Sequence, residues 1–389
     1  MNRAFRDILL LTVACLVTTV SIWIPHYLRL NNFYGLDFSN GFNILYQNYD
    51  GLEYVVIAKS WYDPGLIAQI PQSLPSFYFP SHFPGYPFFI WLLAPLLGYL
   101  KSMLFISQLF TVLSVLTFYK LVKDFKLTTQ PFWLSLVFIF LPARWIGVHS
   151  VASPEPLFVF FTIAAIYSFL KFDHFGGWRW IILTGIFGAL AQLTRPPGIL
   201  LFIALTIYAA IKYWSHNRGI DVVKILKTKI SYLPLMLIPL ALLAVFYLFQ
   251  TRLNNFWAYF NTGDNIHLLF PPYQVFNKDQ FWVGDIWLED LIYIYILGFL
   301  AGIKLFTGNL RSVGIFILIY LLAGISIAHR DISRYLLPIA PFVLIAYEKV
   351  LISKEFKIVL AILAIGLYLY TQNFLLSNTA PINNLLDFN

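Results

Sequence analysis

The sequence predicts an all-α polytopic membrane protein, and its composition is the main reason. Of its 389 residues, 59% are hydrophobic and only 11% are charged, whereas a soluble domain carries roughly 25% charged residues. The mean hydropathy is +0.73, and long apolar runs recur along the chain, as in helical membrane proteins. These features exclude a soluble enzyme, a secreted disulfide scaffold and a disordered chain. The single cysteine, Cys15, excludes an internal disulfide and a cysteine-based metal site.

Eleven apolar segments are expected to cross the bilayer. The first follows a basic N-terminus, and because no small-residue cleavage site comes after it, we expect an uncleaved helix. The expected spans are residues 8–28, 102–122, 131–148, 154–171, 178–194, 196–214, 231–250, 291–306, 312–328, 335–352 and 357–375. A further apolar segment, 87–100, contains Pro95 and has the length of a re-entrant or interfacial element.

The charges in the loops predict how the chain is threaded. If 87–100 does not cross, one side of the membrane holds 17 of the 26 Lys and Arg residues but only 6 of the 18 Asp and Glu residues. If it did cross, Lys120, Lys123 and Lys126 would lie outside. The positive-inside rule favours the first arrangement, with a cytoplasmic N-terminus. The formal net charge of +8 then reflects loop bias and contact with anionic lipid, not nucleic acid.

Two loops on the expected outer side are unusually long, residues 29–86 and 251–290. Loops of this length are more often functional than simple connections. Both are rich in aromatic residues, Pro, Asn and Asp, which is typical of a folded cap on the membrane surface, and we expect juxtamembrane helices in the first. No segment is polar enough for a separate soluble domain, so residues 1–389 are expected to form a single transmembrane domain.

The first outer loop contains the strongest candidate for a catalytic group. Asp50 precedes Gly51, which lets the backbone turn sharply, and an amphipathic stretch from Leu52 to Trp61. A carboxylate held at the rim of the hydrocarbon loses hydration, and desolvation makes a carboxylate a better base. The alternative is that Asp50 serves only as the N-cap of the following helix.

Charged residues also gather at the outer ends of two expected spans. Arg144, His149 and Glu155 lie where the third span ends, and Glu155 begins the next helix between two prolines. Glu155 therefore either belongs to a site or complements the helix dipole. Arg195 precedes two prolines at the start of the sixth span, where it contributes to a site or extends to the headgroups.

A pair of outer arginines is the best candidate for phosphate binding. Arg330 and Arg334 are four residues apart, so both lie on one helix face if the helix begins that early. Arginine binds phosphate through two parallel hydrogen bonds. The alternative is an interfacial anchor pair with Asp331 as counter-ion. By local sequence alone His82 and His267 are ordinary hydrogen-bonding histidines, since no residues show metal-ligand spacing.

Five short motifs occur in one order along the chain. They are Tyr-Asp-Gly-x-x-Tyr at 49–54, Phe-Pro-x-Tyr-Pro at 83–87, an acidic residue before Leu-Phe at 155–158, Thr-Arg-x-x-Gly-Ile-Leu at 194–200 and Arg-Tyr-Leu-Leu-Pro at 334–338. This order resembles the PIG-V-like mannosyltransferases, which are related to the second mannosyltransferase of GPI-anchor assembly. They belong to the GT-C superfamily of polytopic glycosyltransferases, and the resemblance covers roughly residues 45–345.

The resemblance implies a GT-C-like helical bundle with hexosyltransferase activity. Such an enzyme moves a hexose, mannose in the PIG-V-like group, from a polyprenyl-phosphate sugar to a lipid- or glycan-linked acceptor at the outer face, with inversion. It implies Asp50 and Glu155 as catalytic residues and Arg195, Arg330 and Arg334 as donor phosphate-binding residues. The substrate-binding residues expected with them are Tyr49, Tyr54, His82, Tyr86 and Tyr335.

The expected partners are the polyprenyl-phosphate sugar, the acceptor and membrane lipids, without nucleic acid. No cofactor is required, and a divalent metal is compatible with the site but not indicated. We expect the plasma membrane of a prokaryote, because the chain is compact and shows no retrieval signal.

Departures from the family pattern leave the sugar open. Tyr49 stands where the family usually has Trp, and Gly85 replaces a bulkier residue, so glucose, galactose or an aminoarabinose-like unit are alternatives to mannose. A transporter or flippase of lipid-linked sugars is an alternative interpretation of the sequence. A scaffold or receptor with a surface cap is another. A transporter would carry polar residues at mid-depth in its helices, whereas the charges here collect near one face.

Overall fold

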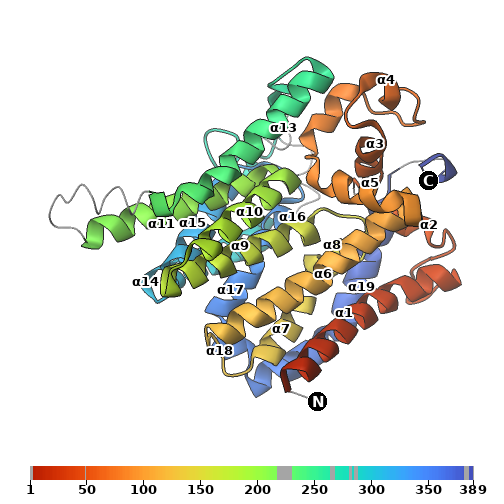
Figure 1. Cartoon of the computed structure of the whole chain (residues 1–389). Helices are drawn as coiled ribbons and strands as arrows, with labels where there is room; N and C mark the ends of the chain where they lie inside the picture. The colour runs from red at the N-terminus through yellow and green to blue at the C-terminus, as the bar shows by residue number, and fades with distance from the viewer. Residues whose placement is uncertain are drawn as a thin grey trace. The chain divides into compact units, whose positions relative to one another are not determined.

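The computed structural model is almost entirely helical (Figure 1). It describes residues 3–48, 50–216, 230–262, 268–279, 283, 288–380 and 385–388. Within these ranges the extended backbone pairs only at two isolated bridges, Phe33 with Leu36 and Asn48 with Thr379. The predicted all-α fold is therefore confirmed.

Seven helical segments in the described ranges are long and apolar enough to cross a membrane. They are α1 (Arg3–Leu28), α6 (Tyr99–Asp124), α9 (Glu155–Phe175), α11 (Ile199–His216) with the preceding η2 (Pro196–Gly198), α13 (Leu237–Leu253) with the preceding η3 (Leu233–Met236), α14 (Leu288–Thr307) and α19 (Lys354–Ser377). An eighth span is formed if α7 (Pro131–Phe140) and α8 (Ala143–His149), bent by 74°, are counted together. The chain is an integral multi-pass membrane protein.

The remaining three expected spans are shorter or broken helices. They are α10 (Trp178–Thr194), α15 (Arg311–Gly324) and the run α16 (Ile332–Tyr335), η7 (Leu337–Ile339), α17 (Ala340–Ala346) and α18 (Glu348–Leu351). At 1.5 Å per residue, α15 is about 21 Å long, whereas the hydrocarbon core is about 30 Å thick. Pro338 lies in the broken run, where a ring without an N–H group interrupts regular helix.

The segment expected to be re-entrant or interfacial forms α5 (Gly85–Leu97), which at 13 residues is about 20 Å long. It ends at Gly98, whose φ of 75° lets the chain turn directly into α6. Helix α5 packs against α6 and against α3 (Gly51–Ser60). Its length agrees with the expectation for an element that does not cross.

The chain divides into two compact units. Unit 1 comprises Met1–Phe160, Leu248–Thr262 and Tyr347–Asn389, and unit 2 comprises Phe161–Tyr247 and Gly263–Ala346. In unit 1, α1 packs against α6, α7 and α19; in unit 2, α15 packs against α11 and α14. The expectation of a single transmembrane domain stays a prediction.

The two long loops contain short helices. The first long loop, residues 29–86, forms α2 (Asn43–Tyr46), α3, α4 (Pro64–Ile67) and η1 (Ser76–Ser81), which confirms the expected helices in this loop. The described part of the second loop contains η4 (Ala258–Asn261) and η5 (Gln274–Phe276). Within unit 1, η4 packs against η1.

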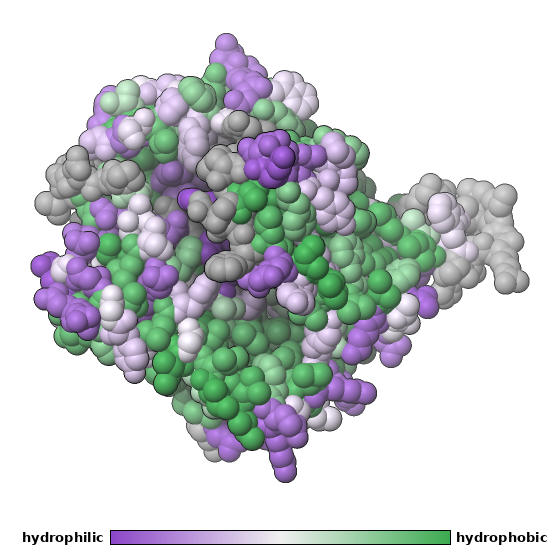
Figure 2. All heavy atoms as spheres, turned by 180° about the vertical axis from the view of Figure 1, so that it is seen from behind, coloured by the Kyte–Doolittle hydropathy of each residue, from purple (hydrophilic) through white to green (hydrophobic). Residues whose placement is uncertain are grey.

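Apolar side chains are exposed on the outer faces of the long helices, as a bilayer requires. Large exposed side chains include Leu9 and Val17 on α1, Leu300 on α14 and Ile362 on α19, and Figure 2 shows apolar residues over much of one face. Inside unit 1, some polar side chains on the helices form hydrogen bonds between helices, which offsets the cost of burying a polar group. Gln372 on α19 joins α1 in this way, donating to Ile22 O at 2.9 Å.

Close packing of α14 on α15 requires a glycine in unit 2. A Cβ at Gly314 would lie 2.3 Å from the backbone nitrogen of Phe306 and 2.7 Å from the carbonyl oxygen of Gly302. Because the obstructing atoms belong to the backbone, an added methyl group must separate the two helices.

We predict that Gly314→Ala lowers the free energy of unfolding by about 1–3 kcal/mol, as overpacking generally does. Gly366→Ala is the matched control, since a Cβ at Gly366 on α19 has nothing within 4 Å. Thermal unfolding of both variants in detergent measures the difference. Equal midpoints for the two variants would contradict the packing argument.

Candidate active site

Asp50 directly precedes α3, and its side chain does not cap the helix. Its carbonyl oxygen accepts hydrogen bonds from the amides of Glu53 at 3.1 Å and Tyr54 at 3.2 Å. The carboxylate makes no capping hydrogen bond. The structure thus excludes an N-cap as the use of this side chain, although the residue occupies the N-cap position.

Gly51, next to Asp50, lies close to Ala152. A Cβ at Gly51 would lie 2.7 Å from the Cβ of Ala152, so α3 rests directly on the turn that precedes α9. The sequence predicts that Gly51 allows a sharp turn of the backbone. The structure shows that the lack of a side chain also matters, because it allows this close approach.

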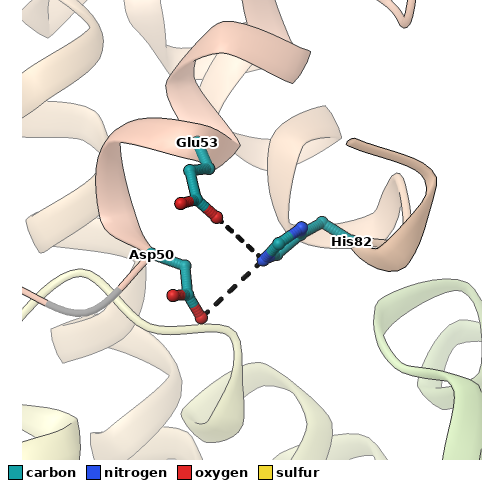
Figure 3. Close-up of side chains that lie close together, drawn as sticks. All are labelled: Asp50, Glu53 and His82. Carbon is teal, nitrogen blue, oxygen red and sulfur yellow. Dashed lines mark ion pairs between the residues drawn. The ribbon is translucent and has the colours of Figure 1, made fainter. Parts of the chain in front are cut away.

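Three side chains converge beside Asp50 (Figure 3). The imidazole Nε2 of His82 lies 3.0 Å from Glu53 Oε2 and 3.7 Å from Asp50 Oδ2. The side chains of Asp50, Glu53 and His82 are 35%, 22% and 6% exposed. Asp50 is therefore the more accessible carboxylate and is farther from the imidazole, whereas Glu53 lies at hydrogen-bonding distance from it.

The hydrogen bonds around His82 fit a protonated ring. When the Ser81 hydroxyl donates to Tyr78 O, 2.8 Å away, it accepts from His82 Nδ1, which also lies 2.8 Å away. With Nδ1 as donor, a neutral ring would direct an unprotonated Nε2 at two carboxylates. Protonation of Nε2 turns this repulsion into attraction, and the imidazolium then bridges Asp50 and Glu53.

The pKa of His82 agrees with this assignment. Burial lowers the pKa, but hydrogen bonds and charge attraction from Asp50 and Glu53 outweigh burial and raise it to about 9. At neutral pH the cluster of two carboxylates and one imidazolium thus carries a net charge of −1. The backbone is fixed as well, because the buried Tyr62 donates its hydroxyl to His82 O at 2.6 Å.

Among the described residues, this cluster is also the set that a metal ion would use. One ligand atom from each of Asp50, Glu53 and His82 lies within 4.8 Å of the others. Two carboxylates and an imidazole are ligands common to several divalent metals. An ion would have to displace the proton on Nε2, so its affinity would rise with pH. The expectation that no metal is required stays a prediction.

Two of the tyrosines expected to bind substrate, Tyr54 and Tyr86, pack together beside His82 of the cluster. The ring of Tyr54 packs edge-on against His82 and against Tyr86, with centroids 4.9 Å and 5.1 Å apart. Both tyrosines are buried, and the Tyr86 hydroxyl donates to Met103 O at 2.6 Å. In this structure they support the cluster, and their contact with substrate stays a prediction.

Glu155 is fully buried and belongs to a network of hydroxyl groups. The Tyr86 hydroxyl lies 2.9 Å from Ser107 Oγ, which in turn donates to Ser153 O at 3.0 Å. The Ser153 hydroxyl donates to the Glu155 carboxylate. This network connects Glu155 to the aromatic side chains that support His82. Its burial favours a supporting role, and the catalytic role stays a prediction.

The arginines expected to bind phosphate lie in unit 2. Arg334 is buried, and its Nη1 lies 4.0 Å from Asp331 Oδ2. The Arg195 guanidinium lies over the ring of Tyr335, 5.3 Å from its centroid, so it packs within the protein. Asp331 makes no capping hydrogen bond at the start of α16, and a buried guanidinium beside one carboxylate is a suitable binding group for an anion.

Two expected site residues, Arg330 and Tyr49, do not belong to either group of side chains described above. Arg330 is exposed and precedes α16, which begins at Ile332, so the condition for sharing a helix face with Arg334 is not met. Tyr49 lies outside the described residues. Sequence analysis missed Glu53, although the spacing of three residues from Asp50 places both on the same face at the start of a helix.

Comparison with known proteins identifies the kind of fold. The family model of the dolichyl-phosphate-mannose-protein mannosyltransferases matches residues 81–249, less than half of the chain. Dolichyl-phosphate-mannose–protein mannosyltransferase 2 of Candida albicans is 23% identical over 128 residues. The aligned part is 31% of this chain and 16% of that protein.

The similarity to solved structures extends further. ArnT from Cupriavidus metallidurans bound to undecaprenyl phosphate superposes with a TM-score of 0.59 over 91% of this chain, at 13% identity. The apo state gives 0.56 over 90% at 14% identity. Both matches cover 63% of the ArnT chain. The chain thus shares the fold of ArnT, which agrees with the predicted GT-C-like helical bundle; the PIG-V-like subgroup stays a prediction.

We predict that His82 makes the stability of the protein depend on pH. Because folding raises the pKa of His82 from 6.5 to about 9, its ion pairs stabilise the fold fully below about pH 6.5, and this contribution is lost as the pH rises through about 9. The thermal midpoint of the wild type should fall more between pH 7 and 10 than that of His82→Gln. Parallel pH profiles would show that His82 is not charged in the folded protein.

Proposed function

We propose that this protein is a polyprenyl-phosphate-sugar-dependent glycosyltransferase with Asp50 as its general base. The observation that carries the proposal is the Asp50–Glu53–His82 cluster at the start of α3, in a chain with a GT-C fold. The family model matched here is named for dolichyl-phosphate-mannose, and the ArnT structure contains undecaprenyl phosphate. Both support a polyprenyl-phosphate sugar as donor.

In the proposed mechanism, the cluster supplies a base, Asp50, whose carboxylate is held beside the pair of His82 and Glu53. The Asp50 carboxylate takes the proton of the acceptor hydroxyl as that oxygen attacks the anomeric carbon of the sugar. The new C–O bond forms as the bond to the phosphate oxygen breaks, and polyprenyl phosphate leaves with the electron pair, so the anomeric configuration inverts. Glu53 holds the imidazolium at 3.0 Å, which leaves Asp50 as the more accessible acceptor of a proton. General-base catalysis of this kind typically contributes 10²–10⁴-fold.

The donor phosphate needs positive charge, which the carboxylate cluster with its net negative charge does not supply. Arg334 in unit 2 is the candidate, because a buried guanidinium stabilises a phosphate leaving group strongly. Arg195 over Tyr335 is the second arginine of this proposal. Arg330 remains a third, more peripheral candidate, since it is exposed.

The proposed subfamily, acceptor, membrane side and location rest on sequence patterns. The order of the five motifs supports a PIG-V-like mannosyltransferase, and a lipid- or glycan-linked hydroxyl is the proposed acceptor. The loop charges support an outer-face site, since a cytoplasmic N-terminus places the first long loop outside. The plasma membrane of a prokaryote is the proposed location.

We predict that Asp50→Asn lowers kcat for sugar transfer by about 10²-fold or more, because the amide cannot take the acceptor proton. The assay uses purified protein in lipid nanodiscs, radiolabelled polyprenyl-phosphate mannose, and a lipid extract as acceptor. Asp63→Asn is the matched control: Asp63 lies in the same loop but caps α4 by accepting from Leu66 N at 2.9 Å, and Asn caps helices equally well.

The same assay discriminates between the alternatives. Transfer that persists in Asp50→Asn would remove Asp50 as the base and direct attention to Glu155. If the wild type transfers no label from mannose, glucose or galactose donors, the enzymatic proposal fails and transport of lipid-linked sugar becomes the leading hypothesis.

We predict that Arg334→Lys weakens binding of undecaprenyl phosphate about tenfold or more. Lysine keeps the positive charge but loses the planar fork that binds phosphate through two hydrogen bonds. Binding is measured by titrating undecaprenyl phosphate into the protein in nanodiscs. Arg311→Lys is the control, because Arg311 is an exposed arginine of the same unit at the start of α15. Equal affinities in the two variants would exclude Arg334 from phosphate binding.

A further inference from the structure

The C-terminal part of unit 1 contacts the chain immediately before Asp50. The amide of Ala380 donates to Gln47 O at 2.9 Å, and Asn48 and Thr379 form an antiparallel bridge. Further along, η8 (Leu385–Phe388) packs against α3, and Phe388 is buried. Figure 1 shows this C-terminal end beside α2 and α3.

Asn48 makes the most specific of these contacts. Its side chain is fully buried, and its Nδ2 donates to Leu375 O at 2.7 Å. Leu375 lies in the last turn of α19, where carbonyl groups have no partner within the helix. The Asn48 side chain therefore completes the C-terminal end of α19.

The backbone of Asn48 connects this contact to the candidate active site. Its carbonyl oxygen accepts a hydrogen bond from Gly51 N at 3.3 Å, so one residue bonds both to the end of α19 and to the first turn of α3. Asp50 lies between these two bonded positions. Gly51 itself lies close to Ala152, since a Cβ at Gly51 would be 2.7 Å from the Cβ of Ala152.

Stability alone explains the Asn48 side chain poorly. Its Oδ1 is buried and has no hydrogen-bond partner among the residues that the structure describes. A buried acceptor left unpaired is destabilising, which offsets part of what the Nδ2 bond contributes. The contact is better explained by its effect on the position of the start of α3.

We propose that Asn48 is a positioning residue for Asp50. Together with Thr379 and Ala380 it forms a clasp, called here the C-terminal clasp, that holds the start of α3 against the end of α19. This inference rests on the proposed function, since it assumes that Asp50 is the base. The clasp keeps the Asp50 carboxylate in register with His82, so its loss should lower kcat with little change in KM for the donor.

A covalent replacement of the clasp tests the proposal. The bridge hydrogen bond joins Ala380 to Gln47, which makes Asn48 and Thr379 a non-hydrogen-bonded pair. Cα atoms in such pairs are about 4.5 Å apart, within the range that a disulfide bridges. The double variant Asn48→Cys with Thr379→Cys, made in a Cys15→Ala background, can therefore be cross-linked at the same position.

We predict that Asn48→Cys alone lowers kcat roughly 10–100-fold, because small displacements of a catalytic group have effects of this size. The oxidised double variant should recover most of the lost kcat, and reduction should abolish the recovery. Gln372→Ala is the matched control: this buried amide lies one turn earlier on α19 but bonds to α1, through Ile22 O. It should lower thermal stability without the same loss of kcat.

Two outcomes would overturn the clasp. One is an unchanged kcat in Asn48→Cys; the other is a disulfide that forms without restoring kcat. Hydrogen–deuterium exchange of residues 51–60 provides a readout that does not require activity. If the wild type transfers no sugar, faster exchange at the start of α3 in Asn48→Cys than in Gln372→Ala still supports the clasp, whereas equal exchange rejects it.

Discussion

Two carboxylates at the start of one helix repel each other unless a positive charge lies between them, and His82 supplies that charge. The arrangement of the first long loop follows from this requirement. Ser81 and Tyr62 fix the ring and backbone of His82, while Tyr54 packs against the face of the ring. Each of these contacts stabilises the imidazolium at one position, and the imidazolium then sets the positions of Asp50 and Glu53.

The unequal distances from Nε2 distinguish the two carboxylates. Glu53 is closer to the imidazole and less exposed, whereas Asp50 is the more accessible carboxylate, which is what the proposed role of general base requires. A histidine that remains protonated at neutral pH is a poor base itself. In the proposed mechanism His82 therefore acts through its charge and position and does not transfer a proton.

Burial separates supporting residues from reacting ones. Glu155 and Tyr86 carry groups with catalytic potential, but both are fully buried in a hydroxyl network. Arg334 in unit 2 is also buried, and its Nη1 lies 4.0 Å from Asp331 Oδ2. The proposed role of Arg334 in binding the donor phosphate depends on its planar guanidinium, which can donate two parallel hydrogen bonds to a phosphate. Asn48 shows a third use of a buried polar group, since it transmits the position of α19 to the start of α3.

The sequence by itself determined the membrane class, because hydrophobic composition and loop charges follow directly from the solvent that surrounds each residue. It also predicted a short helix near 87–100, which the structure contains as α5, and it singled out Asp50 and Arg334, whose roles stay predictions. Only the tertiary structure decided that His82 faces Glu53, that Arg330 is separated from Arg334, and that residues near 380 touch residues near 48. These contacts join positions far apart in the chain or depend on where a helix begins. Local patterns cannot specify them, because they result from packing of the whole unit.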